Sequence, residues 1–330
     1  MQKERSLSTG CVLCHQGAKM VLFLSGLCPR SCWYCPLSKE RKERDVIYAN
    51  ERRIHTPEEA ASVARLMSAL GTGITGGEPL NVPERLQEYA RFLKREFGDS
   101  HHIHLYTGMA PGREDLSGLV GLVDEIRMHP PAEIWDRIVN TPYMEAARNA
   151  RSMGFSIGFE VPSLPGIDSL APMLPFLDFM NINELEWGET NAAAMRERCM
   201  ILEDGVHNAV SGARGWAKHL TSHPKVHWCS SRFKDSVQLR KRLLRVAKNT
   251  ARPFDQITRD GTILYGLLEN KGVFPAIFHQ LEPDMYEQKD GAFETAWWVL
   301  TEFGEQIEGK KTIIERYPDR GLVVEVTPIE

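Results

Sequence analysis

The sequence predicts an α/β fold, a partial (β/α)6 TIM-like barrel followed by a C-terminal α+β extension. Two observations predict it: short apolar runs alternate with helical stretches from residue 18 to about 185, and this rhythm ends after about residue 190. Strands that alternate with helices form parallel β-α units, and right-handed crossovers curl such units into a full or partial barrel. We therefore divide the chain into an N-terminal segment with a C-x-x-C pair (1–17), the barrel (18–230) and the extension (231–330).

The barrel is expected to contain six strands. The first, 19–25 (KMVLFLS), is a short aliphatic run that ends at a glycine, which is typical of a buried strand. A helix should begin at 56–59 (TPEE), where a threonine N-cap, a proline at the first helical position and a glutamate form a capping box. A second helix is expected over 83–97. The other predicted strands are 72–75, 103–107, 125–128, 155–161 and 179–183, and the later helices are 114–122, 142–153 and 168–175.

The patterns differ after about residue 190. Segments 191–200 and 237–249 have helical spacing, whereas 257–267 and 311–326 contain strand-like runs around turns. No further β-α unit is predicted there. The extension is therefore expected to be a small α+β unit.

Composition and charge limit the classes of function. The 330 residues are 42% hydrophobic and 25% charged with a net charge of −4, which does not favour a nucleic-acid partner for the whole chain. No apolar run reaches the roughly 18 residues that span a bilayer, so we expect no membrane contact and a cytoplasmic location. Five of the seven cysteines lie within residues 11–35. Clustered thiols in a reducing compartment indicate metal or iron–sulfur binding rather than disulfides.

The loop after the first strand carries the main motif. Cys28, Cys32 and Cys35 provide three thiolates within eight residues, which suits one face of a cubane iron–sulfur cluster. Three cysteines bind three irons and leave the fourth iron open to an external ligand. A structural zinc site would use four ligands. The loop therefore favours a cluster that binds a cofactor or a substrate.

This C-x-x-x-C-x-x-C spacing, with Tyr34 before the last cysteine, resembles the signature of the radical S-adenosylmethionine (SAM) superfamily. The resemblance implies a [4Fe–4S] cluster at Cys28, Cys32 and Cys35, with the methionine half of SAM on the open iron. It also implies that one electron cleaves SAM to methionine and a 5′-deoxyadenosyl radical, which abstracts hydrogen from a substrate. Tyr34 would lie against the adenine, and the enzyme would be oxygen-sensitive.

A second motif, Gly76-Gly77-Glu78-Pro79, follows the second strand. Two glycines allow close backbone approach, and a glutamate can accept hydrogen bonds from an ammonium group. The motif is similar to the superfamily's GGEP sequence, which binds the SAM amino group.

Polar residues at other strand ends are further candidates, because the chemistry of such barrels lies at the carboxyl ends of the strands. Thr107, Arg127, Glu160 and Asn183 end the third to sixth strands. We expect them to bind the ribose or the carboxylate of SAM, with a solvated rim as the alternative.

Three other cysteines are expected to form an auxiliary site. Cys11 and Cys14 form the C-x-x-C pair before the first strand, and Cys229 follows the barrel. These soft ligands would suit a second [4Fe–4S] cluster, and the alternatives are a zinc knuckle or free thiols.

A basic segment at 232–252 has eight Lys or Arg residues against one acid, Asp235. It is either an RNA- or phosphate-binding face or a solvated helix. The eight are Arg232, Lys234, Arg240, Lys241, Arg242, Arg245, Lys248 and Arg252.

Within the superfamily, the sequence resembles archaeal-type proteins related to the pyruvate formate-lyase activating enzyme. This resemblance implies a protein substrate and a reducing partner such as ferredoxin or flavodoxin. The alternatives are radical modification of tRNA or of a small-molecule cofactor precursor, and a non-catalytic iron–sulfur sensor. The Gly76–Pro79 motif argues against the sensor, which needs no amino-binding loop.

Overall fold

A computed structural model describes residues 7–329. Two compact units make up the chain. The first reaches Gln238, and the second comprises Leu239 onward together with the short segment Leu66–Ser68. The sequence analysis placed the start of the extension a few residues earlier, at 231.

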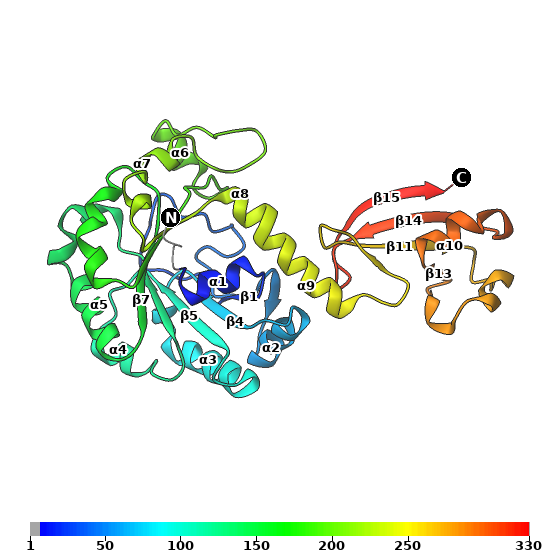
Figure 1. Cartoon of the computed structure of the whole chain (residues 1–330), viewed down its shortest axis with the longest axis horizontal. Helices are drawn as coiled ribbons and strands as arrows, with labels where there is room; N and C mark the ends of the chain where they lie inside the picture. Colours follow the sequence, from blue (N-terminus) through cyan, green and yellow to red (C-terminus); the bar gives the residue numbers. More distant parts are fainter. Residues whose placement is uncertain (1–6, 330) are drawn as a thin grey trace. The chain divides into compact units, whose positions relative to one another are not determined.

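The first unit contains a nine-stranded sheet within the described residues (Figure 1). Seven strands are parallel and follow one another in the order β1-β4-β5-β6-β7-β8-β9, while the β2–β3 hairpin adds antiparallel pairing to β1. No pairing within residues 7–329 joins β9 to β3, so the sheet is open. The strands are β1 (Lys19–Phe23), β2 (Ile47–Ala49), β3 (Arg52–Ile54), β4 (Gly71–Thr75), β5 (His102–Thr107), β6 (Glu125–Met128), β7 (Ser156–Pro162), β8 (Phe179–Asn183) and β9 (Val226–Cys229).

The mixed α/β fold with a large parallel sheet is thus confirmed, and a strand lies at each of the six predicted positions. The structure adds a seventh parallel strand, β9, and the β2–β3 hairpin, which the sequence analysis did not predict. No closed barrel is seen among the described strands.

Helices of the first unit lie mainly on the outer side of the strands, whereas α1 lies inside (Figure 1). The predicted capping box at α2 is present, because Glu59 N donates to Thr56 Oγ1 and the Glu59 carboxylate accepts from Thr56 N. The predicted helix at 168–175 is instead a 3-10 helix that contains Pro172 and Pro175, which lack the N–H of an α-helix. The α-helices are α1 (Thr9–His15), α2 (Pro57–Leu66), α3 (Pro83–Phe97), α4 (Arg113–Ser117), α5 (Pro142–Ser152), α6 (Ala192–Glu197), α7 (Ala213–Trp216) and α8 (Ser231–Phe233), and the longer 3-10 segments are Ala132–Asn140 and Ile167–Phe176.

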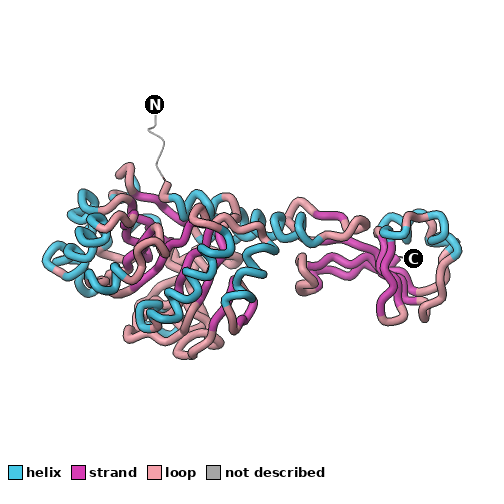
Figure 2. Tube along the Cα trace, turned by 90° about the horizontal axis from the view of Figure 1, so that it is seen from below, coloured by secondary structure: helices cyan, strands magenta, loops and turns pink. Residues whose placement is uncertain are grey.

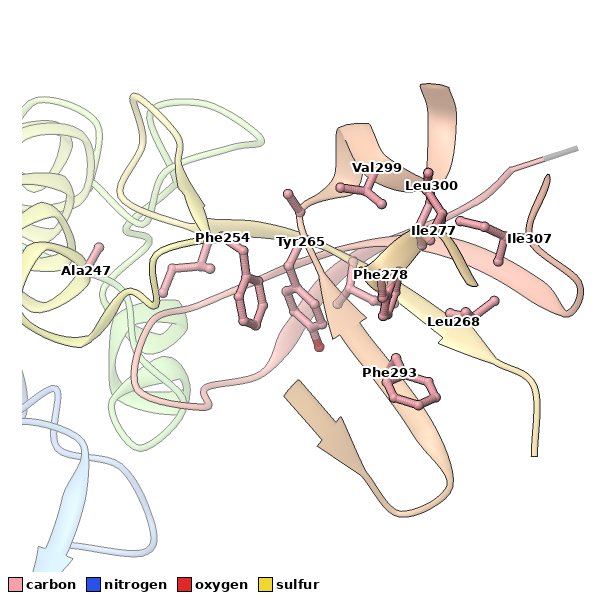
Figure 3. Close-up of a cluster of buried hydrophobic side chains, with 13 residues drawn as sticks. Ala247, Phe254, Tyr265, Leu268, Ile277, Phe278, Phe293, Val299, Leu300 and Ile307 are labelled. Atoms are coloured by element: carbon pink, nitrogen blue, oxygen red, sulfur yellow. The ribbon is translucent and has the colours of Figure 1, made fainter. Parts of the chain in front are cut away.

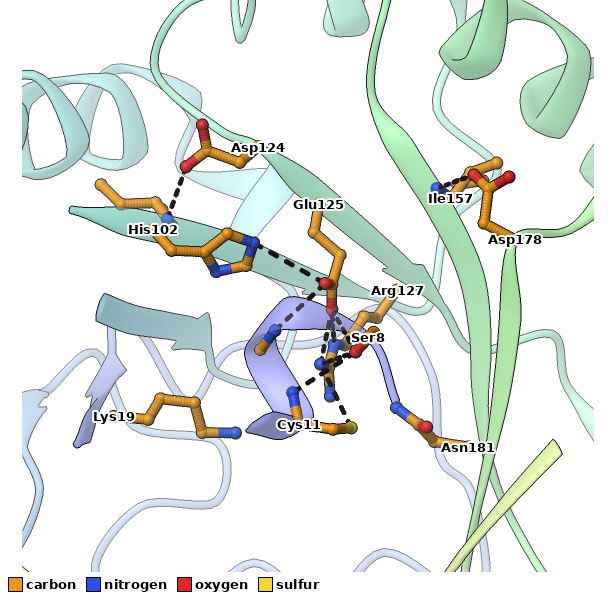
Figure 4. A network of polar contacts seen from close by, with 12 residues as sticks. Ser8, Cys11, Lys19, His102, Asp124, Glu125, Arg127, Ile157, Asp178 and Asn181 are labelled. Atoms are coloured by element: carbon orange, nitrogen blue, oxygen red, sulfur yellow. Dashed lines mark hydrogen bonds and ion pairs between the residues drawn. The ribbon is translucent and has the colours of Figure 1, made fainter. Parts of the chain in front are cut away.

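Arg127 of β6 is a buried cation on the inner side of the sheet, with only 2% of its side chain exposed (Figure 4). Its Nε donates to Glu125 at 2.6 Å, and its Nη1 donates to Glu160 at 2.6 Å. Its Nη2 donates to Ser8 Oγ at 2.9 Å, next to α1. Two carboxylates and several hydrogen bonds offset the cost of removing this charge from water.

The second unit is an antiparallel sheet with one apolar core, as an α+β unit should be (Figures 2 and 3). The strand order is β12-β13-β11-β14-β15, and β10 pairs with β11. Phe278, Phe293 and Leu300 are almost completely buried in its core. The elements are α9 (Arg240–Thr250), β10 (Gln256–Ile257), β11 (Ile263–Glu269), β12 (Tyr286–Lys289), β13 (Ala292–Thr295), α10 (Trp297–Glu302), β14 (Lys310–Arg316) and β15 (Val323–Ile329), and the π-helical segment Lys234–Leu239 precedes α9.

Over residues 7–329, the structure contains no helix that is both long and apolar enough to cross a membrane.

His104 of β5 predicts how stability depends on pH. Its ring is fully buried between Gly10 and Gly73, and neither ring nitrogen has a hydrogen-bond partner in the described chain. Burial lowers the pKa of His104 well below 6.5, and the nearby cations Arg127 and Lys19 act in the same direction. The unfolded chain therefore takes up this proton first, so the free energy of unfolding falls as the pH falls below about 6.5.

We expect His104→Leu to reduce the slope of the free energy of unfolding with pH by up to about 1.4 kcal/mol per pH unit below pH 6.5. The variant has no imidazole at this position to take up a proton on unfolding. Urea unfolding at several pH values between 5 and 7.5 measures the slope. The exposed His219→Leu variant is the control. An unchanged slope in His104→Leu would contradict the assignment.

Candidate functional site

One cavity of about 370 Å³ lies at the carboxyl ends of the parallel strands. This volume is in the range of pockets that bind small molecules, roughly 300–1,000 Å³. Residues from the cysteine loop, from the Gly-Gly turn and from the ends of β5, β7 and β8 line it. The predicted residues among them are Cys28, Cys32, Tyr34, Cys35, Gly76, Gly77, Thr107, Glu160 and Asn183.

The cysteine loop (26–36) and Ser25 just before it touch the Gly-Gly turn through backbone atoms. Gly77 N donates to Ser25 O at 2.6 Å, and Glu78 N donates to Leu27 O at 2.9 Å. A Cβ on Gly77 would lie 2.4 Å from Leu27 O, and one on Gly76 would lie 2.6 Å from Ser25 O. Both positions therefore require glycine if the two segments are to approach this closely.

The three cysteines of the loop all line the cavity. Cys28 is exposed, Cys32 and Cys35 are half-buried, and all three are free. Burial raises the pKa of the Cys28 and Cys32 thiols. In the described residues no three His, Cys, Asp or Glu side chains converge on a single-ion site. Three cysteines that line one cavity fit a cubane cluster, because each would bind a different iron.

Tyr34 is fixed by His129, which follows β6. The Tyr34 hydroxyl lies 3.0 Å from His129 Nε2, and His129 Nδ1 lies 2.9 Å from the carbonyl oxygen of Glu160. A carbonyl only accepts, so Nδ1 carries the proton and Nε2 accepts from the Tyr34 hydroxyl. The loop is thereby connected to the ends of β6 and β7.

Glu78 and Pro79 differ from the sequence-based expectation, because neither lines the cavity. Glu78 is 1% exposed. Its carboxylate accepts from Thr107 Oγ1 at 2.8 Å, from Gly108 N at 2.7 Å and from Leu80 N at 3.0 Å. Glu78 therefore joins the Gly-Gly turn to the end of β5, and it is the backbone of Gly76 and Gly77 that faces the cavity.

Arg127 does not line the cavity either, in contrast to its expected contact with SAM. The Arg127 side chain points to the inner side of the sheet, where it contacts Glu125, Glu160 and Ser8 before α1. Glu160 does line the cavity and accepts from the side-chain amides of Asn181 and Asn183 at 3.0 Å each. Burial opposes ionisation of Glu160, but Arg127, Lys19 and the two amides outweigh it and lower its pKa to about 2.

Cys11 and Cys14 are buried on α1, at 7% and 9% exposure, and neither lines the cavity. Arg127 Nη2 donates to Cys11 Sγ at 3.6 Å (Figure 4). Burial raises the pKa of Cys229 to about 12, and the neighbouring Cys14 and Cys11 thiols act in the same direction. The three thiols are thus near one another. The second cluster stays a prediction.

The segment after β8 that holds the cysteine loop was not predicted from the sequence. Thr190 Oγ1 donates to Cys35 O at 3.2 Å and also to Leu37 O. Asn191, which is 1% exposed, donates to Tyr34 O at 3.1 Å. Asn191 was expected to begin a helix, and it does precede α6. Its hydrogen bond to the cysteine loop has no signal in the local sequence, because the two segments are about 155 residues apart.

A loop with three thiols and no fourth cysteine, placed at the carboxyl edge of a parallel sheet beside a Gly-Gly-Glu-Pro turn, defines the radical SAM class of proteins. The chain is 39% identical over 277 residues to a Methanocaldococcus jannaschii protein named "Putative glycyl-radical enzyme activating enzyme". The match covers 79% of this chain and 73% of that protein. The chain belongs to this family of radical SAM proteins related to activating enzymes.

Other likenesses are weaker. Residues 261–329 match the family model described as a domain of unknown function, DUF8061. The structure resembles Streptococcus suis SuiB bound to S-adenosylmethionine with a TM-score of 0.43 and 11% identity, over 64% of this chain and 50% of SuiB. SuiB bound to the precursor peptide SuiA gives a TM-score of 0.39 and 10% identity, over 64% and 48%. The chain spans about half the length of SuiB.

The contacts of Glu78 predict a structural defect for Glu78→Gln. Glutamine replaces one carboxylate oxygen with an NH₂ group, which donates and cannot accept. Three buried donors contact the Glu78 carboxylate, so at least one of them loses its acceptor. We expect the free energy of unfolding to fall by about 1–3 kcal/mol, as measured by urea unfolding. Glu84→Gln, on the exposed side of α3, should change it little. Equal stability of the two variants would show that these hydrogen bonds contribute nothing.

Proposed function

We propose that this protein cleaves SAM reductively at a [4Fe–4S] cluster held by Cys28, Cys32 and Cys35. The observation that carries the proposal is the cavity itself, which three separate thiols line without a fourth cysteine. When bound, the cluster supplies the electron that converts SAM to methionine and a 5′-deoxyadenosyl radical, which takes hydrogen from the substrate. We infer also that the open sheet of the first unit is the partial barrel of radical SAM type.

The chain's own residues bind and orient SAM in this proposal. The backbone of Gly76 and Gly77 contacts the SAM ammonium, and Glu78 keeps that turn in place through Thr107 and Gly108. Tyr34, held by His129, contacts the adenine. Glu160 and Asn183 contact the ribose, since both are polar and line the cavity. Arg127 acts on this side only by positioning Glu160.

As substrate we propose a glycine residue of a partner protein, because the name of the Methanocaldococcus jannaschii relative describes an activating enzyme of glycyl-radical enzymes. A ferredoxin or flavodoxin would supply the electron, in a cytoplasm that keeps thiols reduced. The basic segment 232–252 does not favour RNA as the substrate, because several of its cations already have partners within the protein. Of its cations, Lys234 pairs with Glu186, Arg252 pairs with Asp255, and Arg245 donates to Met67 O.

The variant with Cys28, Cys32 and Cys35 all changed to Ala should produce no 5′-deoxyadenosine, because no cluster can form in the cavity. The protein is reconstituted anaerobically with iron and sulfide, reduced with dithionite and incubated with SAM. Chromatography then measures 5′-deoxyadenosine. Cys199→Ala, which changes an exposed thiol outside the cavity, should keep wild-type production. Undiminished production by the triple variant would refute the proposed function.

Iron and sulfide counts on the same triple variant test the second cluster. If Cys11, Cys14 and Cys229 hold one, the variant should retain about half of the wild-type iron and sulfide, since four of eight irons would remain. Bound zinc without colour would indicate a zinc site, and a metal-free variant would indicate free thiols. Either of these results would refute the second cluster and leave the first unaffected.

A further inference from the structure

The outermost strand of the second unit, β15, is paired on one side only. It ends the strand order, and β14 is its neighbour among the described strands (Figure 1). An edge strand presents unpaired backbone N–H and C=O groups, and proteins usually keep such strands short or charged. The opposite edge follows this rule, because β12 has four residues that include Glu287 and Lys289. In contrast, β15 has seven residues that include Val323, Val324 and Val326.

These three valines are each more than half exposed, and Val326 continues a row of side chains that is buried up to that point. Tyr265 of β11 lies opposite Ile314 of β14, and Ile314 lies opposite Val326. Along this row the exposed fraction is 5%, 6% and then 55%. Residues opposite each other in an antiparallel pair share one face of the sheet. The apolar face of the sheet therefore ends at an uncovered strand, which a further strand beyond β15 would bury.

The charge on β15 indicates what kind of strand this would be. Glu325 lies between two of the valines and directly opposite Glu315 of β14. Like charges in these positions repel each other. The hydrogen bonds to the two carboxylates come from hydroxyl groups, since Glu315 accepts from Thr262 Oγ1 and Glu325 accepts from Thr327 Oγ1. A cation opposite Glu325 on the outer side of β15 would offset this repulsion.

We propose that β15 binds an extended segment of a partner protein, in which apolar residues flank a Lys or Arg that faces Glu325. The segment adds a strand to the sheet, so that backbone hydrogen bonds provide affinity and alternate side chains provide specificity. A second copy of this chain fits less well, because β15 contains no Lys or Arg to place opposite Glu325. The strand belongs to residues 261–329, which match a domain of unknown function, and this role does not depend on SAM cleavage.

Two labelled peptides, STVKVTS and STVEVTS, test this role when their binding to the full-length protein is measured by fluorescence anisotropy. The lysine peptide should bind about threefold or more tightly than the glutamate peptide, because it places an opposite charge at Glu325. Glu325→Lys should reverse this preference. Val326→Ser should weaken both peptides, since apolar contact is lost. Gln288→Lys, at an exposed position of β12, is the matched control and should change neither affinity. Methylation of the central three backbone nitrogens of STVKVTS should abolish binding, because strand pairing needs those N–H groups.

Three results would overturn the inference. If neither peptide binds the wild-type protein, β15 is not a docking strand. If the two peptides bind equally, or if Glu325→Lys leaves the preference unchanged, Glu325 does not select a cation. Sedimentation of the protein without peptide gives the third test. A wild-type dimer that Val326→Ser dissociates would assign β15 to a second copy of the chain instead of a partner protein.

Discussion

The buried guanidinium of Arg127 is the interaction on which the first unit most depends. It contacts Glu125 on its own strand, Glu160 on β7, Tyr106 on β5 and Ser8 before α1. Glu160 in turn accepts from Asn181 and Asn183 of β8. One charge therefore joins four adjacent strands and α1. A buried ion pair adds little net stability, but loss of one partner leaves an unpaired buried charge and costs about 3–5 kcal/mol.

This network explains why the polar residues at the strand ends divide into two groups. Residues that point inward, such as Arg127, connect strands to one another and satisfy one another's charges. Other residues of this network, such as Glu160 and Asn183, also line the cavity. The cavity wall is thus positioned by buried polar contacts beneath it, and side chains outside the cavity determine where the groups that line it lie.

Much of the fold could be predicted from the sequence, because strands that are buried on both faces form continuous apolar runs. The seventh strand, β9, contains the polar sequence Val-His-Trp-Cys and lacks that signal. The sequence identifies the motif residues but does not reveal which groups their side chains contact. Glu78 had the residue type of an ammonium acceptor, and only the fold shows that Thr107, Gly108 and Leu80 already occupy its carboxylate. Thr190 and Asn191 were missed because their contacts are long-range.

The glycine contacts between the cysteine loop and the Gly-Gly turn have a consequence for how this site varies. Their separation is set by the radii of main-chain atoms, since a Cβ at Gly77 would lie 2.4 Å from Leu27 O and 2.7 Å from Gly26 O. No side chain at another position can bring the cysteine loop and the turn this close. The approach of the cysteine loop to the turn is therefore fixed by the peptide backbone and not by side chains.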